Sequence, residues 1–174
     1  MNVNVNLTLT FLRVGAVDLL PFFEWMETSL LGHIGKSYGG IYAIGQSLHL
    51  MSMAVLGGMV LVTDLRLLNL VLRDVPSELV ADNAHKWFKW ALVLIVATGI
   101  FMASAVAIRM YHNPFFWAKM ISLLVGIAFV FAIKRPLLRG EHADVNPMVL
   151  KTVAVASLML WFTVAATGRW IGFS

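Results

Sequence analysis

One apolar stretch of the chain carries a polar stripe whose residue types are suited to binding a cofactor. Gln46, His49, Met53 and Asp64 recur within or just after the stretch 41–63, and on a helix they fall within an arc of about 80°. Polar groups inside a bilayer are costly, so each is expected to have a partner or a function. The imidazole of His49 would lie about 12 Å along this helix from its outer end. At that depth it is a candidate axial ligand for haem iron.

Basic side chains are expected to gather near His49 at the outer end of the neighbouring segments. Lys119 lies early in the third apolar segment, Arg109 ends the second, and Arg169 follows the fourth. Cationic groups there would pair with the propionates of a haem b held by His49. The chain has no cysteine, which excludes a covalently attached c-type haem but not haem b.

The second axial ligand stays open at this point. His112, just beyond the second segment, is the first candidate for a metal ligand beside His49, and His33 in the N-terminal region is the alternative. In a competing interpretation, His49 only hydrogen-bonds to a backbone carbonyl or a serine of a neighbouring helix. Lys119 and Arg169 would then contact lipid headgroups.

A second polar zone is predicted at the opposite end of the bundle. His85 opens the second segment and His142 lies in the last loop, so that a second haem between them is one interpretation. The alternative is a solvated loop region held by ion pairs, such as Asp64 with Lys86 or Lys89.

The elements that must position these groups are four membrane-spanning helices, predicted at 41–63, 87–108, 114–133 and 148–168. Each has about 20 residues, which is enough for a hydrocarbon core of about 30 Å. The composition agrees, since 60% of the residues are hydrophobic and 13% are charged, whereas soluble domains have about 25% charged residues. Asn-Pro pairs are predicted to open the third and fourth helices, and Pro136 is predicted to close the third.

The fold class that follows is all-α, an integral membrane four-helix bundle with a short interfacial amphipathic N-terminal helix. Residues 1–20 form an arm in which polar and apolar residues partly alternate. Residues 21–36 have helical periodicity but are short, so this helix is expected to lie on the membrane. Residues 37–174 form the transmembrane domain.

Lys and Arg residues are more numerous in the loops after the first and third helices than at the other ends. The positive-inside rule then places both termini in the periplasm, in the inner (cytoplasmic) membrane of a bacterium. The net charge of +4 does not indicate nucleic-acid binding, because the basic residues flank apolar segments instead of lining one soluble face.

Four motifs resemble a family of small bacterial four-helix membrane proteins that is described only as a domain of unknown function. They are Gln46-Ser-Leu-His49-Leu, the run 61–68 with Asp64 and Arg66, Asn113-Pro114 followed by Lys119, and Gly168-Arg169-Trp170-Ile171-Gly172. The resemblance covers roughly residues 22–172.

The layout of that family is similar to membrane cytochromes b and copper-resistance D-type proteins, in which histidines on helices hold haem. The resemblance implies that His49 matches the histidine of the family's first helix. Asp64, Arg66, Lys119 and Arg169 match its recurring charged positions. The chain departs from the di-haem cytochromes because it has no clear pair of histidines on facing helices.

The leading hypothesis is an integral membrane haem b-binding electron-transfer protein or subunit, with an outer-side haem, between a quinone pool and a periplasmic redox partner. The alternative is a structural or accessory membrane subunit without a cofactor, in a homo-oligomer or a larger membrane complex. A third interpretation is a channel or carrier for a small anion or lipid. No phosphate-binding glycine loop, His-Glu-x-x-His motif or nucleophile elbow is present, so soluble-type hydrolysis is not predicted.

Overall fold

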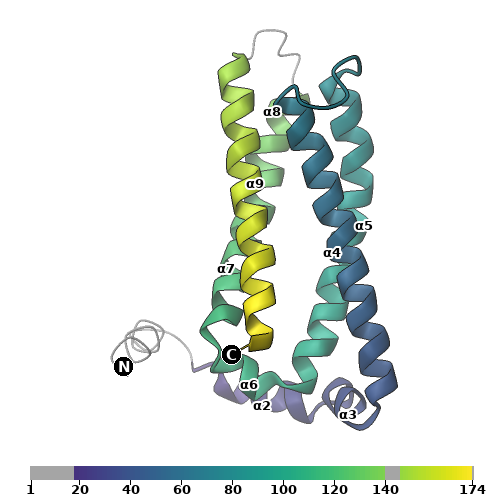
Figure 1. Cartoon of the computed structure of the whole chain (residues 1–174). Helices are drawn as coiled ribbons and strands as arrows, with labels where there is room; N and C mark the ends of the chain where they lie inside the picture. The colour runs from purple at the N-terminus through teal and green to yellow at the C-terminus, as the bar shows by residue number, and fades with distance from the viewer. Residues whose placement is uncertain (1–17, 140–145, 174) are drawn as a thin grey trace.

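The computed structural model describes residues 18–139 and 146–173. The first seventeen residues of the predicted arm, and His142, lie outside this part. Four long helices form the bundle (Figure 1): α4 (Gly39–Leu67), α5 (Ser77–Ala105), α7 (Pro114–Phe129) and α9 (Pro147–Trp170). The prediction of an all-α four-helix bundle is confirmed.

All four helices are long and apolar enough to cross a membrane, α7 together with its continuation to Leu138. Only 11–33% of the most apolar 18 residues in each helix is buried inside the bundle. Most of the apolar surface therefore faces outward, where hydrocarbon can cover it. The chain is a multi-pass membrane protein.

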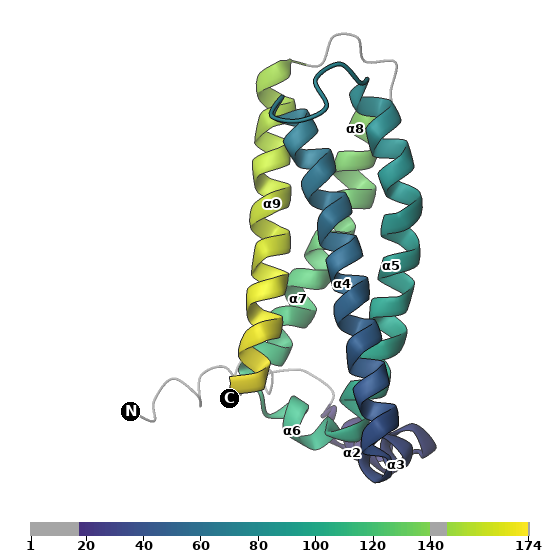
Figure 2. The same cartoon turned by 45° about the vertical axis from the view of Figure 1, so that its right-hand side comes forward.

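The shared core lies between the four helices. Leu56 and Val60 of α4 pack with Phe88 and Ile95 of α5 and with Trp161 of α9. The rings of Phe88 and Trp161 meet edge to face at 5.5 Å, a favourable geometry for an aromatic pair. Contacts between α4 and α5 and between α7 and α9 join the helices in two pairs. The pairs diverge toward the end at which α6 (Ala107–Tyr111) lies (Figures 1 and 2).

The N-terminal helical region consists of two helices where the sequence predicted one. α2 (Leu20–Thr28) and α3 (Leu30–Ser37) are separated by Ser29. The backbone of Ser29 is extended, and its hydroxyl accepts a hydrogen bond from the Gly32 N–H at 3.3 Å, so it acts as the N-cap of α3. Both helices lie across the α6 end of the bundle (Figure 2). Their contact with a membrane surface stays a prediction.

The second long helix begins at Ser77 and ends at Ala105, so it starts ten residues before the predicted span 87–108. Pro76 stands just before it, where proline is well tolerated because the first helical N–H groups have no partner in the helix. The polar start of α5 therefore extends the helix beyond its apolar part. At the other end, Val106 breaks the helix and α6 follows.

The third long helix also differs from its prediction. Pro136 was expected to close it, and that expectation is wrong, since the chain stays helical through α8 (Arg135–Arg139). A π-helical turn, Val130–Lys134, precedes the proline. Proline lacks an N–H and clashes with the carbonyl four residues earlier. In membrane helices a local π turn relieves such a conflict.

Both Asn-Pro helix starts are confirmed. The side chain of Asn113 accepts a hydrogen bond from the Phe115 N–H at 2.9 Å, and that of Asn146 accepts one from the Met148 N–H at the same distance. Each asparagine therefore provides an N-cap ahead of a proline in the first helical turn. These caps fix where α7 and α9 begin.

The connection between α4 and α5 is held by Arg66. Its guanidinium donates from Nε to the carbonyl of Val75 at 2.7 Å and from Nη1 to Asn69 Oδ1 at 2.8 Å. Asn69 has a φ of 58°, a left-handed conformation that asparagine tolerates better than most residues. Arg66 therefore shapes this loop.

Candidate functional site

His49 is buried in the bundle, with 8% of its surface exposed. Its Nδ1 lies 2.8 Å from Thr98 Oγ1 on α5. Gly99 lies beside the imidazole, since a Cβ atom there would be 3.4 Å from His49 Cε1. α5 therefore holds one edge of the ring and packs closely against it.

The hydrogen bonds around Thr98 indicate the tautomer of His49. The Thr98 hydroxyl donates to the carbonyl of Leu94 at 2.6 Å. Its oxygen is then available as an acceptor, so His49 Nδ1–H is the donor in the bond between them. The proton resides on Nδ1, and Nε2 carries the lone pair. A histidine in this state is ready to bind a metal through Nε2.

Lys119 reaches the same region from α7. It is half-buried, and its charge acts on His49. A Cβ atom at Gly168 of α9 would lie 3.2 Å from Lys119 Nζ, so the lysine chain runs along this glycine. The predicted role of Lys119 beside His49 stays a prediction.

The other predicted outer residues lie nearer the surface. His33, Arg109, His112 and Arg169 are all exposed. The His112 ring packs edge to face with Tyr111 at 5.0 Å, and the Arg169 guanidinium lies 4.4 Å from the centre of the Phe173 ring. Neither His33 nor His112 is buried in the bundle with His49. Within the described ranges, no three His, Asp or Glu side chains gather into a metal-binding group.

A second buried polar site joins α4, the π-helical turn and α9. Lys134 Nζ lies 2.6 Å from Asp64 Oδ1 and donates to Ser157 Oγ at 3.4 Å. Asp64 and Ser157 are fully buried and Lys134 is 5% exposed. A complete ion pair therefore lies within the bundle, toward the α8 end.

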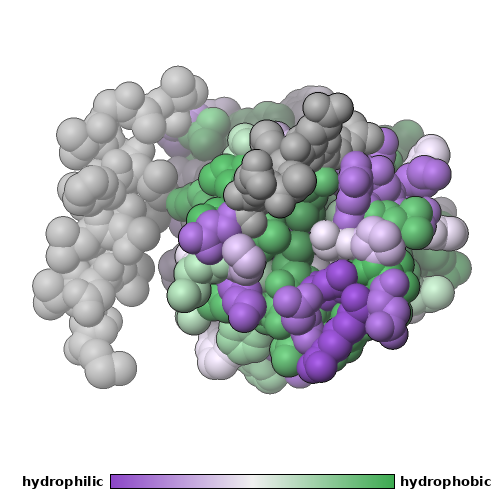
Figure 3. Space-filling model, turned by 90° about the horizontal axis from the view of Figure 1, so that it is seen from above, coloured by the Kyte–Doolittle hydropathy of each residue, from purple (hydrophilic) through white to green (hydrophobic). Residues whose placement is uncertain are grey.

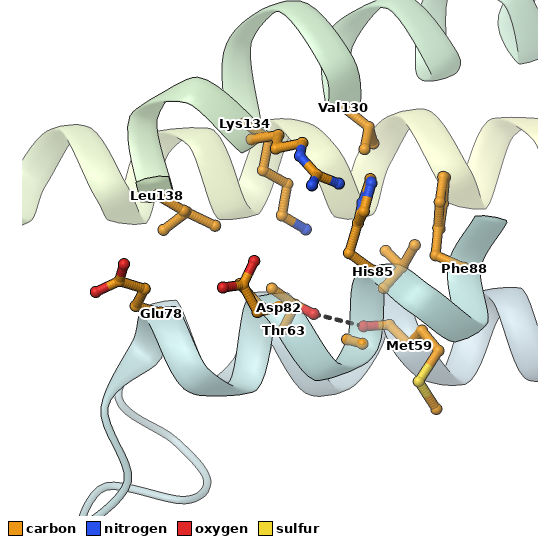
Figure 4. Close-up of a pocket in the computed structure, with 13 residues that line it drawn as sticks. Met59, Thr63, Glu78, Asp82, His85, Phe88, Val130, Lys134 and Leu138 are labelled. Atoms are coloured by element: carbon orange, nitrogen blue, oxygen red, sulfur yellow. Dashed lines mark hydrogen bonds between the residues drawn. The ribbon is translucent and has the colours of Figure 1, made fainter. Parts of the chain in front are cut away.

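A cavity of about 50 Å³ adjoins this pair (Figure 4). Lys134 and Val130 line it from the π-helical turn, and Asp82 and His85 project toward them from α5. Hydrophilic residues gather at this end of the molecule (Figure 3). The cavity is large enough to hold water.

The predicted partners of Asp64 are wrong. Lys86 and Lys89 are exposed, while Lys134 forms the ion pair. Lys134 was not predicted as a buried residue, because Pro136 indicates the end of the third helix and Lys134 then counts among the loop charges. A signal was present in the apolar residues on both sides, Phe131-Ala132-Ile133 and Leu137-Leu138, because they indicate that the apolar helix continues past the proline.

The predicted second haem between His85 and His142 stays untested, because His142 lies outside the described residues. His85 is half-buried against the cavity. Its ring packs edge to face against Phe131 at 5.4 Å and is stacked with Phe88 at 6.2 Å. These contacts fix the imidazole between the core and the cavity.

Comparison with known proteins supports the family resemblance and no more specific relationship. No curated protein and no solved structure matches the chain significantly. No link to the membrane cytochromes b or to the copper-resistance D-type proteins is shown. A family model matches residues 22–174, which is most of the chain. The protein therefore belongs to the family of unknown function DUF6644.

Proposed function

We propose that the protein binds haem b through His49 and transfers electrons within the membrane. The observation that carries this proposal is the orientation of the buried imidazole. Its Nδ1–H is directed to Thr98, which leaves the lone pair of Nε2 for iron. Histidines that ligate metals usually have their other ring nitrogen hydrogen-bonded in this way.

The surroundings of His49 supply further support. Lys119 reaches this region from α7, and an ammonium there is a suitable partner for a haem propionate. Arg109 and Arg169, exposed at the same end, are the proposed partners nearer the surface.

The second axial position would be filled by His112 or His33. Both lie on or beside the short helices at the α6 end and are exposed, so either would have to turn inward when haem binds. Bound haem would supply one-electron chemistry at its iron, with a potential set by the axial ligands and burial. We place the α6 end and both termini in the periplasm, with a quinol as electron donor and a periplasmic protein as acceptor.

The test is a reduced-minus-oxidised absorption spectrum of protein purified in detergent after expression with ample haem. We expect sharp Soret and α bands at about one haem per chain, as in b-type cytochromes. His49→Ala should abolish them, whereas Arg73→Ala, an exposed change at the other end, should not. His112→Ala and His33→Ala then identify the second ligand by a shifted spectrum.

A flat spectrum of the unaltered protein would overturn the haem proposal. A colourless protein with a reproducible oligomeric state in mild detergent would favour a structural or accessory subunit. Unchanged haem content in His49→Ala would instead retain the cofactor and refute the ligand assignment.

A further inference from the structure

The Asp64–Lys134 ion pair is an expensive feature if its purpose is only to hold helices together. Both charges are removed from solvent, with Asp64 fully buried and Lys134 5% exposed. Well-packed apolar residues of similar volume often serve equally well in such positions. Ionisable residues inside membrane-spanning bundles more often belong to ion or proton pathways.

The Asp64 carboxylate has polar partners on two neighbouring elements. Lys134 Nζ lies 2.6 Å from Oδ1, and the Ser157 side chain is a further partner. An ionised carboxylate offers about four lone-pair sites. It therefore retains acceptor capacity that a proton can use.

Lys134 connects the buried pair to the cavity. The π-helical turn Val130–Lys134 widens the helix at this point, and such turns occur frequently at functional sites. The lysine lines the cavity while its ammonium contacts Asp64. The cavity, of about 50 Å³, has room for water beside a charged group that would hold it.

The other side of the cavity is an acidic and imidazole-bearing face of α5. Glu78, Asp82 and His85 all line the cavity, and their spacings of four and three residues place them on one face of the helix. Glu78 and Asp82 are exposed and His85 is half-buried. The three residues thus form a series of proton-carrying groups from solvent at the α8 end toward Lys134 (Figure 4).

We propose that the Asp64–Lys134 pair is a proton-exchange site, which takes up protons from the α8 end through this cavity. In the step, Lys134 Nζ gives one of its protons to Asp64 Oδ1. A hydronium in the cavity, or protonated His85, then returns a proton to Nζ. The net change is one proton bound, with Asp64 as a neutral carboxylic acid and Lys134 still an ammonium.

The groups that face the pair from every packed element bear on its response to pH. Thr63 comes from α4, the three acidic and imidazole residues from α5, Arg135 from α8 and Ser157 from α9. Arg135 lines the cavity and is half-buried. It adds positive charge beside Lys134 at the cavity.

The experiment is infrared difference spectroscopy of the full chain, with carbon-13 in its aspartates, in lipid membranes during a pH jump. We expect a reversible carboxylic-acid band that disappears in Asp64→Asn. If Asp64→Asn does not fold, Asp64→Leu combined with Lys134→Met removes both charges and must also lack the band. This readout requires no haem, so its outcome is separate from that of the haem test.

The proposed entry route for protons is tested by the rate at which the Asp64 band appears after the pH jump. Asp82→Asn with His85→Ala should slow the appearance of the Asp64 band several-fold and leave its final amplitude unchanged. Asp74→Asn is the matched control, because Asp74 is exposed at the same end but does not line the cavity, and its rate should equal that of the unaltered protein. Absence of an Asp64-dependent band at any pH at which the protein is folded would overturn the proposal. Unchanged rates in the double variant would refute the route.

Discussion

Lys134 Nζ lies 2.6 Å from Asp64 Oδ1 and thereby joins the π-helical turn after α7 to the last turn of α4. Removing one partner would leave the other charge buried without compensation. Lys134→Met should therefore lower the free energy of unfolding by about 3–5 kcal/mol. Unfolding titrations in mixed detergent micelles would measure this loss.

The control for this prediction is the double variant Asp64→Leu with Lys134→Met. It removes both charges, and replacing a buried pair by apolar groups is often neutral or stabilising. Its stability should therefore return close to that of the unaltered protein. A double variant as unstable as Lys134→Met alone would show that the ion pair itself is essential for folding.

Thr98 should control haem binding without touching the haem. Its hydroxyl fixes the Nδ1 side of His49, and loss of such a hydrogen bond typically lowers metal affinity by about 10–100-fold. Thr98→Val should therefore reduce haem affinity in titrations followed by absorption. Thr163→Val is the matched control, since Thr163 is exposed and, among the described residues, its hydroxyl donates to the Met159 carbonyl of its own helix. Equal affinities in the two variants would contradict the role of Thr98.

Periodicity predicted that His49 faces inward, because a stripe of polar residues on an apolar helix can only avoid lipid in the bundle interior. Its partner Thr98 was not predictable in the same way. That contact depends on how α4 and α5 are rotated and shifted against each other, and single-sequence patterns do not specify this. Lys119 was expected in the same half of the bundle because it lies in the first turns of its helix, at the end where the helix of His49 also begins.

The failure at Lys134 has a different origin. Proline is a reliable helix terminator in water, where a break leaves the backbone groups solvated. Inside a bilayer the freed groups must find partners within the chain, and a π turn supplies them. Treating Pro136 as a helix terminator therefore gives the wrong end for the third helix and places Lys134 in a loop instead of the bundle interior. The break between α2 and α3 at Ser29 was not predicted either, because the apolar periodicity of 21–36 continues across this N-cap.

Acid should loosen the N-terminal helices through Glu27. Its Oε1 lies 2.6 Å from Lys36 Nζ, and its Oε2 accepts the Ile108 N–H at 2.6 Å. Partial burial opposes the charged form, but these interactions outweigh it and hold the pKa of Glu27 below its ordinary value of 4.5. The stabilisation is therefore complete above the unfolded value of 4.5 and is lost as the pH falls through the lower folded pKa.

Hydrogen–deuterium exchange across residues 20–37 would detect this loosening, after correction for the intrinsic pH dependence of exchange. Protection should fall at acidic pH in the unaltered protein, and Glu27→Gln should show the lower protection already at neutral pH. The control is Glu24→Gln, which changes another carboxylate on α2 and leaves the Glu27–Ile108 hydrogen bond at the start of α6 in place. Protection in Glu27→Gln equal to that of the unaltered protein would refute the prediction.

Gly32 marks a close crossing of the N-terminal helices with the bundle. A Cβ atom there would collide with the Glu27 carbonyl, and it would lie 2.8 Å from the carbonyl oxygen of Ser104 on α5. Both obstacles are backbone atoms, which cannot rotate away as a side chain can. Gly32→Ala should therefore destabilise the protein by about 1–3 kcal/mol, the usual cost of overpacking.

Gly40→Ala is the control, because nothing lies within 4 Å of a Cβ atom there and alanine favours the helix. Thermal unfolding in detergent should show a lower midpoint for Gly32→Ala only. Equal midpoints would mean that α3 can move away from α5 without loss of stability.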